Sequence, residues 1–238
     1  MLIIYAHACI IKVDQVLGLR RYFMLKGKKL SILGDSVSTY WGVSNDRTAN
    51  STIWGNRCYY DEPFPLEKTY WSLVMKEFGL ELCVNNSWSG GNLSGRDIEA
   101  AGVNRANYLS RDDGTQPDFI IVFMGLNDLG RMIDYNVFAS DYEKTLLTIK
   151  EKHPNATVCC INMPNRTISV KERTIIFNEI IENKVKVAGE KFFVCDLFSS
   201  DFANDNYYNN TTDGLHPDED GMRMIAECVI KSIKENVK

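Results

Sequence analysis

The sequence lacks the apolar run of a membrane-spanning protein and the excess of positive charge typical of a nucleic-acid-binding protein. It has no apolar run near the roughly 18 residues that a membrane-spanning helix requires. It also has no excess of positive charge, because 27 lysines and arginines stand against 31 aspartates and glutamates, a formal net charge of −4. A basic surface for nucleic acid or an anionic membrane is therefore missing. We expect no membrane span, no nucleic-acid partner and, at 238 residues, one sizeable domain.

Cysteine pairs at the C-x-x-C spacing are missing as well. The seven cysteines are an odd number, and several lie within apolar runs. This pattern indicates small buried side chains in a reduced compartment, rather than a disulfide framework or a zinc site. The features of a signal peptide are also lacking, since Arg20 and Arg21 follow the first apolar stretch and no small-residue cleavage site is present. We therefore expect a cytoplasmic protein.

Residues 1–27 are predicted to be an N-terminal appendage to a domain formed by residues 28–238. Ile10, Val13 and Leu17 have the spacing of one face of a short amphipathic helix. Alternatively, Met24 is the natural start, because the residues that follow it are an ordinary beginning for a first strand. Under either interpretation, residues 1–23 contribute nothing to the chemistry predicted below.

From residue 28 onward, short apolar runs alternate with stretches of helical periodicity. The predicted strands are 29–33, 80–85, 119–124, 157–163 and 192–195. The predicted helices are 66–78, 137–152, 174–188 and a last helix with Pro217 at its first position and acidic residues 218–220 in its first turn. Near-continuous apolar strands separated by helices predict an α/β fold of three layers, with a mostly parallel five-stranded sheet between two layers of helices.

Three polar, glycine-rich segments directly follow predicted strands. They are residues 34–36, 85–91 and 125–128. Ligands of such sheets bind beyond the carboxyl ends of the strands. We therefore expect these three loops to meet at one edge of the sheet and to form the functional site.

Only three histidines are present, so the search for a catalytic base is short. His7 lies in the predicted appendage, and His153 precedes a proline at a helix end, where we expect the surface. His216 lies in the turn before the last helix, and Asp213 is close enough for its carboxylate to accept a hydrogen bond from the ring Nδ1–H. The Nε2 atom would then face a serine, the arrangement that makes a serine hydroxyl nucleophilic.

Four short segments together resemble the four sequence blocks of the SGNH (GDSL-like) hydrolase superfamily. They are Gly34-Asp35-Ser36, Gly90, Gly-x-Asn-Asp at 125–128 and Asp213-x-x-His216, in that order within residues 30–217. One block alone is a weak signal, whereas the ordered set of four is specific. Residues 85–90 are also similar to the second block of bacterial members. The resemblance implies the SGNH hydrolase fold, with a flavodoxin-like five-stranded sheet.

The resemblance also implies the reaction. The protein would be a serine esterase or acylhydrolase that needs no metal and no cofactor. Ser36 would attack the acyl carbon, His216 would act as general base and then as general acid, and Asp213 would orient His216. Ser87 and Ser89 are rival serines, but neither closes a strand-to-helix turn as Ser36 does.

An oxyanion hole follows from the same resemblance. Its donors would be the backbone N–H of Ser36, the backbone N–H of Gly90 and the side-chain amide of Asn127. A glycine lets the backbone approach closely, and a neutral amide suits developing negative charge. The neighbouring Gly91 is an alternative to Gly90. Asp128, in the same block as Asn127, is expected to be a structural hydrogen-bonding residue of its loop.

An aromatic-rich stretch between the first two blocks indicates the substrate class. It contains Tyr40, Trp41, Trp54, Tyr59, Tyr60, Phe64, Tyr70 and Trp71, interleaved with Asn45, Asp46, Arg47, Asn56 and Arg57. Flat rings beside hydrogen-bonding side chains suit a sugar better than a long alkyl chain. Trp41, shortly after Ser36, is best placed to line the site, whereas Trp71 has the spacing of a core residue.

Asp35, Gly91 and Asn92 are further candidates for substrate binding, although Asp35 also suits a structural role in its own loop. We therefore expect hydrolysis of an ester-linked short acyl group on a carbohydrate or another small polar molecule. Two alternatives stay open at this point. One is an acyltransferase that uses the same triad, and the other is a non-catalytic carbohydrate-binding relative.

Overall fold

Five parallel strands form the central sheet, in the order β2-β1-β3-β4-β5. The computed structural model describes residues 25–44, 58–165, 170–202 and 205–237. The strands are β1 (Lys29–Gly34), β2 (Glu81–Ser87), β3 (Phe119–Phe123), β4 (Thr157–Ile161) and β5 (Phe192–Cys195). This order confirms the predicted flavodoxin-like sheet. Residues 1–24 of the predicted appendage, and residues 45–57 of the aromatic stretch, lie outside the described residues.

The strands are apolar on both faces, which suits a parallel sheet covered from both sides. All five residues of β3 are buried, as is every residue of β1 after Lys29. The polar Ser31 of β1 is accommodated because its hydroxyl donates to the Leu109 carbonyl at 2.7 Å. The strand ends carry the polar loops, so the buried sheet positions those loops at its edge.

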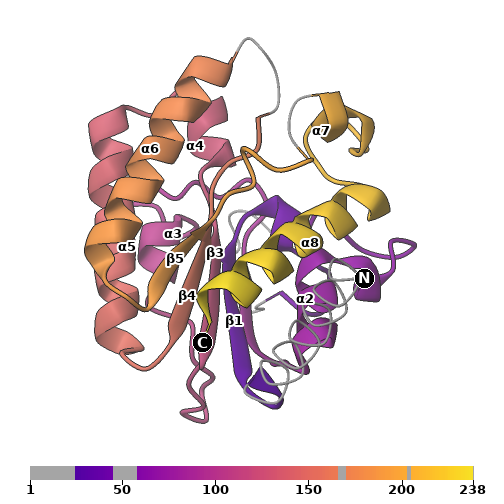
Figure 1. Ribbon diagram of the computed structural model, residues 1–238. Helices are drawn as coiled ribbons and strands as arrows, with labels where there is room; N and C mark the ends of the chain where they lie inside the picture. Colours follow the sequence, from indigo (N-terminus) through magenta and orange to yellow (C-terminus); the bar gives the residue numbers. More distant parts are fainter. Residues whose placement is uncertain (1–24, 45–57, 166–169, 203–204, 238) are drawn as a thin grey trace, which may run out of the picture.

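Helices cover the sheet on both sides and complete the three predicted layers (Figure 1). One side carries α2 (Tyr70–Phe78) and α8 (Glu219–Asn236), and the other carries α3 (Gly102–Arg105), α5 (Tyr135–Lys152) and α6 (Lys171–Ala188). Two short helices, α4 (Leu126–Gly130) and α7 (Asp205–Asn209), come after β3 and β5. Within the described ranges, no helix has both the length and the apolar character needed to cross a membrane.

The helix predicted for residues 66–78 is divided in the structure. Residues Leu66–Lys68 form a separate 3-10 turn, η3, and α2 begins only at Tyr70. Thr69 caps α2 because its hydroxyl accepts the Ser72 N–H at 3.3 Å. The extended backbone of a capping threonine is incompatible with one continuous helix.

The start of the last helix also differs from the prediction. Pro217 does not occupy its first position, because α8 begins at Glu219 and Asp218 is the capping residue. The Asp218 carboxylate accepts the Gly221 N–H at 2.9 Å. An aspartate that satisfies a free amide of the first turn fixes the boundary more strongly than the backbone preference of a proline.

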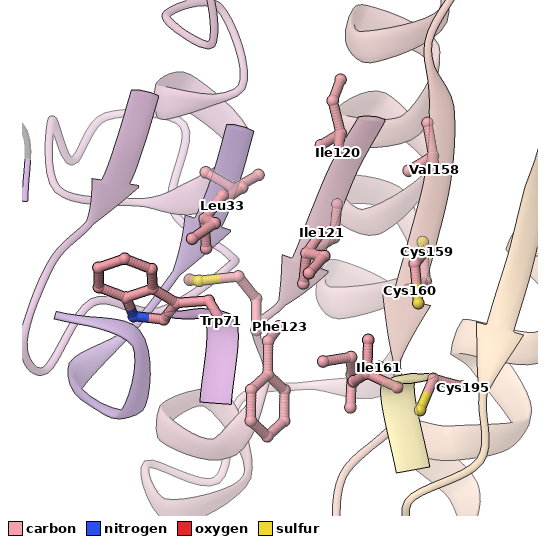
Figure 2. Packing of buried hydrophobic residues seen from close by; sticks show 14 of the residues in the cluster. Leu33, Trp71, Ile120, Ile121, Phe123, Val158, Cys159, Cys160, Ile161 and Cys195 are labelled. Atoms are coloured by element: carbon pink, nitrogen blue, oxygen red, sulfur yellow. The ribbon is translucent and has the colours of Figure 1, made fainter. Parts of the chain in front are cut away.

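The core lies between the sheet and both helix layers (Figure 2). Trp71 is buried there, as predicted. Cys159 and Cys160 of β4 and Cys195 of β5 pack among aliphatic and aromatic side chains, as Figure 2 shows. These three cysteines, together with Cys83, confirm the prediction of small buried side chains.

His153 is buried as well, at 5% exposure, so the prediction of a surface position is wrong. Its ring Nδ1 lies 2.7 Å from the Gln116 side-chain oxygen, and burial lowers the pKa of the ring. The reason is the short connection between α5 and β4. Because the chain turns directly from the helix end into a central strand, His153 is carried inward beneath that end.

Candidate active site

Ser36 lies at the carboxyl end of β1 and opens the short 3-10 helix η1 (Ser36–Ser38). Gly34 permits this turn. A Cβ at Gly34 would lie 2.5 Å from the Ser38 Cβ and 2.7 Å from the Ser87 Oγ, too close for any larger residue. The sequence Gly-Asp-Ser therefore turns the chain sharply and places Ser36, which is 5% exposed, at the edge of the sheet.

Asp35 caps the same turn, since its Oδ1 accepts the Val37 N–H at 3.0 Å. Its side chain is buried, at 1% exposure. Burial raises the pKa of Asp35 to about 7, although the Val37 N–H and the charge of Arg105 act in the opposite direction. This position fits the structural role that the sequence offered for Asp35 beside substrate binding. Asp35 is a buried carboxyl group that holds the turn of Ser36.

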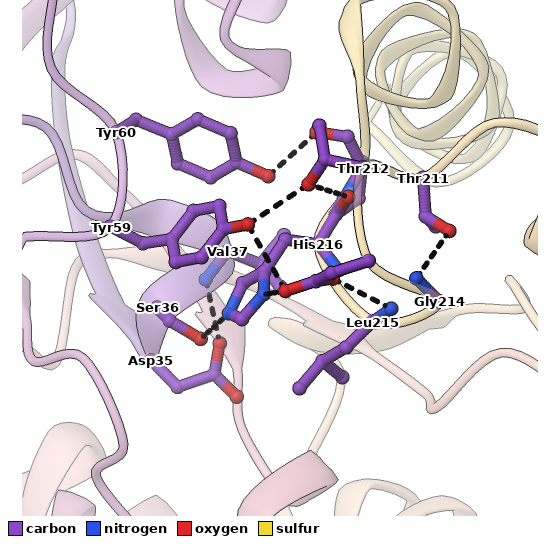
Figure 3. Close-up of polar contacts among 12 residues, drawn as sticks. Asp35, Ser36, Val37, Tyr59, Tyr60, Thr211, Thr212, Gly214, Leu215 and His216 are labelled. Atoms are coloured by element: carbon purple, nitrogen blue, oxygen red, sulfur yellow. Dashed lines mark hydrogen bonds and ion pairs between the residues drawn. The ribbon is translucent and has the colours of Figure 1, made fainter.

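The turn before α8 brings an imidazole to Ser36 (Figure 3). The Nε2 of His216 lies 2.9 Å from the Ser36 Oγ, and its Nδ1 lies 2.7 Å from the Asp213 Oδ2. The other carboxylate oxygen of Asp213 accepts the N–H groups of Leu215 at 3.0 Å and His216 at 2.8 Å. This Asx-type turn orients the carboxylate toward the ring. Ser36, His216 and Asp213 thus form one hydrogen-bonded chain.

The charge of Asp213 is held in place although its side chain is 43% exposed. Partial burial acts to raise the pKa of Asp213, but the hydrogen bonds from His216 and Leu215 outweigh it and lower the pKa to about 2. The carboxylate is therefore ionised throughout the neutral range. An ionised partner fixes a proton on Nδ1, which leaves Nε2 as the acceptor for the Ser36 hydroxyl.

The two glycines that the sequence left as alternatives have different surroundings. The N–H of Gly91 donates to the Trp88 carbonyl at 2.9 Å, and the Gly91 carbonyl accepts from the Asn127 amide at 3.0 Å. Gly90 has φ +74°, in the left-handed region that favours glycine. No residue within the described part of the chain accepts from the Gly90 N–H. The Gly91 N–H is thus used within its own turn, whereas the Gly90 N–H is not.

Asn127 and Asp128 lie side by side in α4 with different partners. The Asn127 amide, bound to Gly91, also lies 3.5 Å from the Asp35 Oδ2, so it spans the gap between the first and second loops. Asp128 is fully buried, and its two oxygens accept the N–H groups of Leu93 at 2.7 Å and Ser94 at 2.9 Å. Burial raises the pKa of Asp128. Asp128 thus ties α4 to the loop after β2.

Asn92 is held by a residue that the sequence did not single out. The Nη1 of Arg131 donates both to the Asn92 side-chain oxygen and, at 2.8 Å, to the Gly90 carbonyl. Arg131 itself is exposed. The substrate-binding role expected for Asn92 therefore competes with its contact to Arg131, which also fixes the carbonyl of Gly90.

Most described aromatic side chains of the stretch from Tyr40 to Trp71 belong to the core. The buried ones are Tyr40, Tyr60, Tyr70 and Trp71. Trp41 differs, because its side chain is 60% exposed while its backbone N–H donates to the Tyr60 carbonyl at 2.9 Å. Among the described aromatic residues of the stretch, Trp41 is the one whose side chain is exposed. Trp54 and its polar neighbours at 45–57 lie outside the described residues.

A buried arginine behind the loops was also missed. Arg105 of α3 is 3% exposed and donates to the carbonyls of Gly34 at 3.0 Å, of Ala100 at 2.8 Å and of Asn86. Burial lowers the pKa of its guanidinium to about 10, which leaves it charged at neutral pH. Arg105 thereby joins the carboxyl ends of β1 and β2. A lone arginine in a short helix carries no sequence signal for such a role.

Tyr59 is the third residue, after Arg131 and Arg105, whose contacts in the site the sequence did not show. The sequence placed it in the aromatic stretch without a partner, whereas the structure places its ring beside His216 (Figure 3). Contacts between residues so far apart in the chain leave no local signal in the sequence.

The arrangement has a definite chemical capability. A serine hydroxyl that donates to an imidazole, itself oriented by a carboxylate, can lose its proton as it attacks an electrophilic carbon. Amide donors nearby can bind the negative charge that develops on the attacked group. Over the described ranges, no group of histidine, cysteine and acidic residues has the arrangement of a metal site.

The sequence of the chain matches one known protein family. The family model of GDSL-like lipases/acylhydrolases matches residues 28–233. No curated protein matches the chain in sequence.

Three solved structures illustrate the shared fold. A Bacteroides uniformis protein assigned to the GDSL-like lipases has a TM-score of 0.67 at 23% identity, covering 90% of this chain and 98% of its own. A lipase/acylhydrolase from Enterococcus faecalis has a TM-score of 0.60 at 18% identity, covering 89% and 97%. A family two carbohydrate esterase from Clostridium thermocellum has a TM-score of 0.61 at 16% identity, covering 90% and 65%. At these identities the similarity shows the fold alone.

Proposed function

The chain belongs to the GDSL-like lipase/acylhydrolase family, and from this premise we propose that it removes short acyl groups, acetyl above all, from a sugar or another small polar molecule. Family membership makes the protein an ester-hydrolysing serine hydrolase and confirms the resemblance predicted from the sequence. The alternative of a non-catalytic relative is therefore set aside. We also propose that residues 28–238 form the hydrolase domain and that residues 1–27 are an appendage without a catalytic role.

The proposed mechanism rests on one observation, the 2.9 Å contact between the Ser36 Oγ and the His216 Nε2. Oγ attacks the acyl carbon while Nε2 takes its proton, and the imidazolium then gives that proton to the departing alcohol. This leaves an acyl group on Ser36. A water molecule attacks the acyl carbon and its proton passes to Nε2. The imidazolium then returns this proton to the Ser36 Oγ as the bond between Oγ and the acyl carbon breaks, which releases the carboxylic acid. Asp213 stabilises the imidazolium in both steps.

The negative charge on the tetrahedral intermediate needs donors. We assign this role to the N–H groups of Ser36 and Gly90 and to the amide of Asn127. The occupied N–H of Gly91 supports the choice of Gly90. The contact of Asn127 with the Gly91 carbonyl, at 3.0 Å, supports a preorganised amide that does not have to turn as the charge develops.

Two observations support a small polar substrate. The exposed indole of Trp41 offers a flat face, which suits the ring of a sugar. In addition, carbohydrate esterases of family two are among the solved structures that share the fold. A long acyl chain would need a deep aliphatic lining, and the stretch from Tyr40 to Trp71 contains few leucine, isoleucine or valine residues.

A hydrolysis panel tests the proposal. Wild-type protein and Ser36→Ala are assayed on p-nitrophenyl esters from acetyl to palmitoyl and on acetylated sugars. We expect wild-type turnover that falls with acyl length, and none with Ser36→Ala. Faster turnover of palmitoyl than of acetyl esters contradicts the short-chain preference. If the acyl group is transferred to an added alcohol, so that an ester forms in place of the free acid, the result would favour an acyltransferase.

A further inference from the structure

The ring of Tyr59 lies face to face with the imidazole of His216. The two ring centroids are 3.4 Å apart and the ring planes differ by 11° (Figure 3). By contrast, Tyr59 meets the neighbouring Tyr60 edge-on, at 4.9 Å and 74°. His216 is therefore held between the Ser36 hydroxyl, the Asp213 carboxylate and an aromatic face.

The hydroxyl of Tyr59 reaches the carboxylate of the same site. It lies 3.1 Å from the Asp213 Oδ2, the oxygen that also faces the His216 Nδ1, and 2.9 Å from the Thr212 Oγ1. Burial raises the pKa of Tyr59, and the hydrogen bond and charge of Asp213 raise it further, against the hydrogen bond with Thr212, which lowers it. The phenol thus keeps its proton, and its O–H donates a hydrogen bond to the carboxylate. One side chain contacts both His216 and Asp213.

The stacking geometry has a preferred protonation state. Two neutral aromatic rings repel when stacked directly face to face, because their quadrupoles favour offset or edge-on arrangements. A cation over the face of a tyrosine ring is attracted instead. The observed parallel stack therefore stabilises His216 more when it is protonated, which is its state after taking the Ser36 proton.

We propose that Tyr59 is a positioning residue of this active site, whose ring stabilises the protonated imidazole of His216 while its hydroxyl fixes Asp213. The inference rests on the proposed function, since it assigns His216 the role of base. The ring and the hydroxyl act on His216 in opposite senses. The ring favours the imidazolium, whereas the hydroxyl draws negative charge away from the Asp213 oxygen that faces it.

Other groups that titrate lie near the stack. They are Asp213 on the same turn, Asp35 at the end of β1, and Tyr60 beside Tyr59. Burial raises the pKa of Tyr60. Tyr60 offers a matched control. Its hydroxyl donates to the Pro217 carbonyl at 2.7 Å, so it holds the same turn without touching the Asp213 carboxylate.

The test uses the full chain and a fluorophosphonate probe, which labels an activated serine without knowledge of the natural substrate. The second-order labelling rate is measured from pH 5 to pH 9 for wild type, Tyr59→Leu, Tyr59→Phe and Tyr60→Phe, with melting temperatures recorded alongside. The low-pH midpoint of the profile reports protonation of the base, and the plateau reports its orientation.

The three variants have different expected profiles. Tyr59→Leu loses both the ring and the hydroxyl, so its midpoint should lie about half to one unit below that of Tyr59→Phe, and its plateau should fall about tenfold below wild type. Tyr59→Phe keeps the ring but loses the hydroxyl, so its midpoint moves to higher pH with a plateau within about threefold of wild type. Tyr60→Phe keeps the wild-type midpoint, whatever its melting temperature.

A Tyr59→Leu midpoint equal to that of Tyr59→Phe, together with a wild-type plateau, overturns the inference. Midpoint shifts of equal size and sign in Tyr60→Phe and Tyr59→Phe overturn it too, because they reveal a general loosening of the turn. Neither result touches the proposed function, which fails separately if Ser36→Ala still takes up the probe at the wild-type rate.

Discussion

Ser36 and His216 are 180 residues apart in the chain, yet Oγ and Nε2 lie 2.9 Å from each other. The sheet explains the contact. Ser36 follows the carboxyl end of β1, and the turn before α8 returns to the same edge after β5, where Asp213 holds the imidazole by its Nδ1. The contact therefore depends on the topology of parallel strands and on one local turn.

Asp213→Asn should lower kcat by about 10⁴-fold, the loss found when the orienting carboxylate of a triad becomes an amide and the histidine takes the wrong tautomer. KM should change little. Steady-state kinetics at pH 7.5 measure both. Asp218→Asn is the matched control, because asparagine also caps a helix and α8 should stay intact. A kcat within tenfold of wild type would remove Asp213 from the triad.

The difference in stability between wild type and Asp213→Asn should depend on pH. The folded-state pKa of Asp213 is depressed to about 2, so the ionised carboxylate stabilises the fold above its unfolded-state value near pH 4. That contribution is lost as the pH falls through about 2. In thermal melts, the melting temperature of wild type should be higher than that of Asp213→Asn at pH 7. This difference in melting temperature should close toward pH 2.

Asn127→Ala should lower kcat by about 10²–10³-fold and leave KM within about threefold, because its amide acts mainly on the tetrahedral intermediate. Asn107→Ala, which removes an exposed amide that donates to the Asn104 carbonyl, serves as the control and should behave as wild type. A raised KM with normal kcat would show instead that Asn127 binds the ground-state substrate.

The fold was predictable because its strands are short, apolar and separated by helices. The segments 29–33 and 192–195 became β1 and β5 with almost the same bounds. Helix starts were less predictable, since the side-chain caps Thr69 and Asp218 moved them by a few residues. The prediction that His153 lies at the surface was wrong because no local sequence pattern shows how the short connection from α5 to β4 carries this residue into the core.

The site was predictable where its chemistry is local in sequence. The turn of Asp213 and His216 and the Gly-Asp-Ser loop are short segments whose geometry follows from their residues. The different surroundings of Gly90 and Gly91 depend on the turn that uses the Gly91 N–H, which the sequence does not show. The stacking of Tyr59 and the buried hydrogen bonds of Arg105 join distant parts of the chain, so only the fold brings them together.

Asp35→Asn should stabilise the protein in a pH-dependent way. The folded-state pKa of Asp35 is raised to about 7, so the unfolded chain ionises first and the wild-type fold loses stability as the pH rises from about 4 to 7. Asparagine keeps an acceptor for the Val37 N–H without the charge. At pH 8 the melting temperature of the variant should be on the order of 5 °C above that of wild type. At pH 4 the two melting temperatures should be the same. A gap that does not change with pH would contradict this.

Trp41→Ala should lower kcat/KM about tenfold for an acetylated sugar, because the exposed indole supplies a stacking face, and by less than about threefold for p-nitrophenyl acetate. The two substrates are compared on one enzyme preparation. Tyr108→Ala removes another exposed aromatic ring, outside the stretch, and should leave both values unchanged. Equal losses on both substrates would show that Trp41 does not contact the sugar.

The most direct test of the central claim is to find which side chain a fluorophosphonate modifies. Full-length protein is labelled at pH 8, digested and analysed by mass spectrometry, with Ser36→Ala and His216→Ala alongside. We predict one adduct per chain, located on Ser36, absent from Ser36→Ala and formed at least about 10³-fold more slowly in His216→Ala. An adduct on Ser87 or Ser89, or undiminished labelling of Ser36→Ala, would contradict the assignment of Ser36 as the nucleophile.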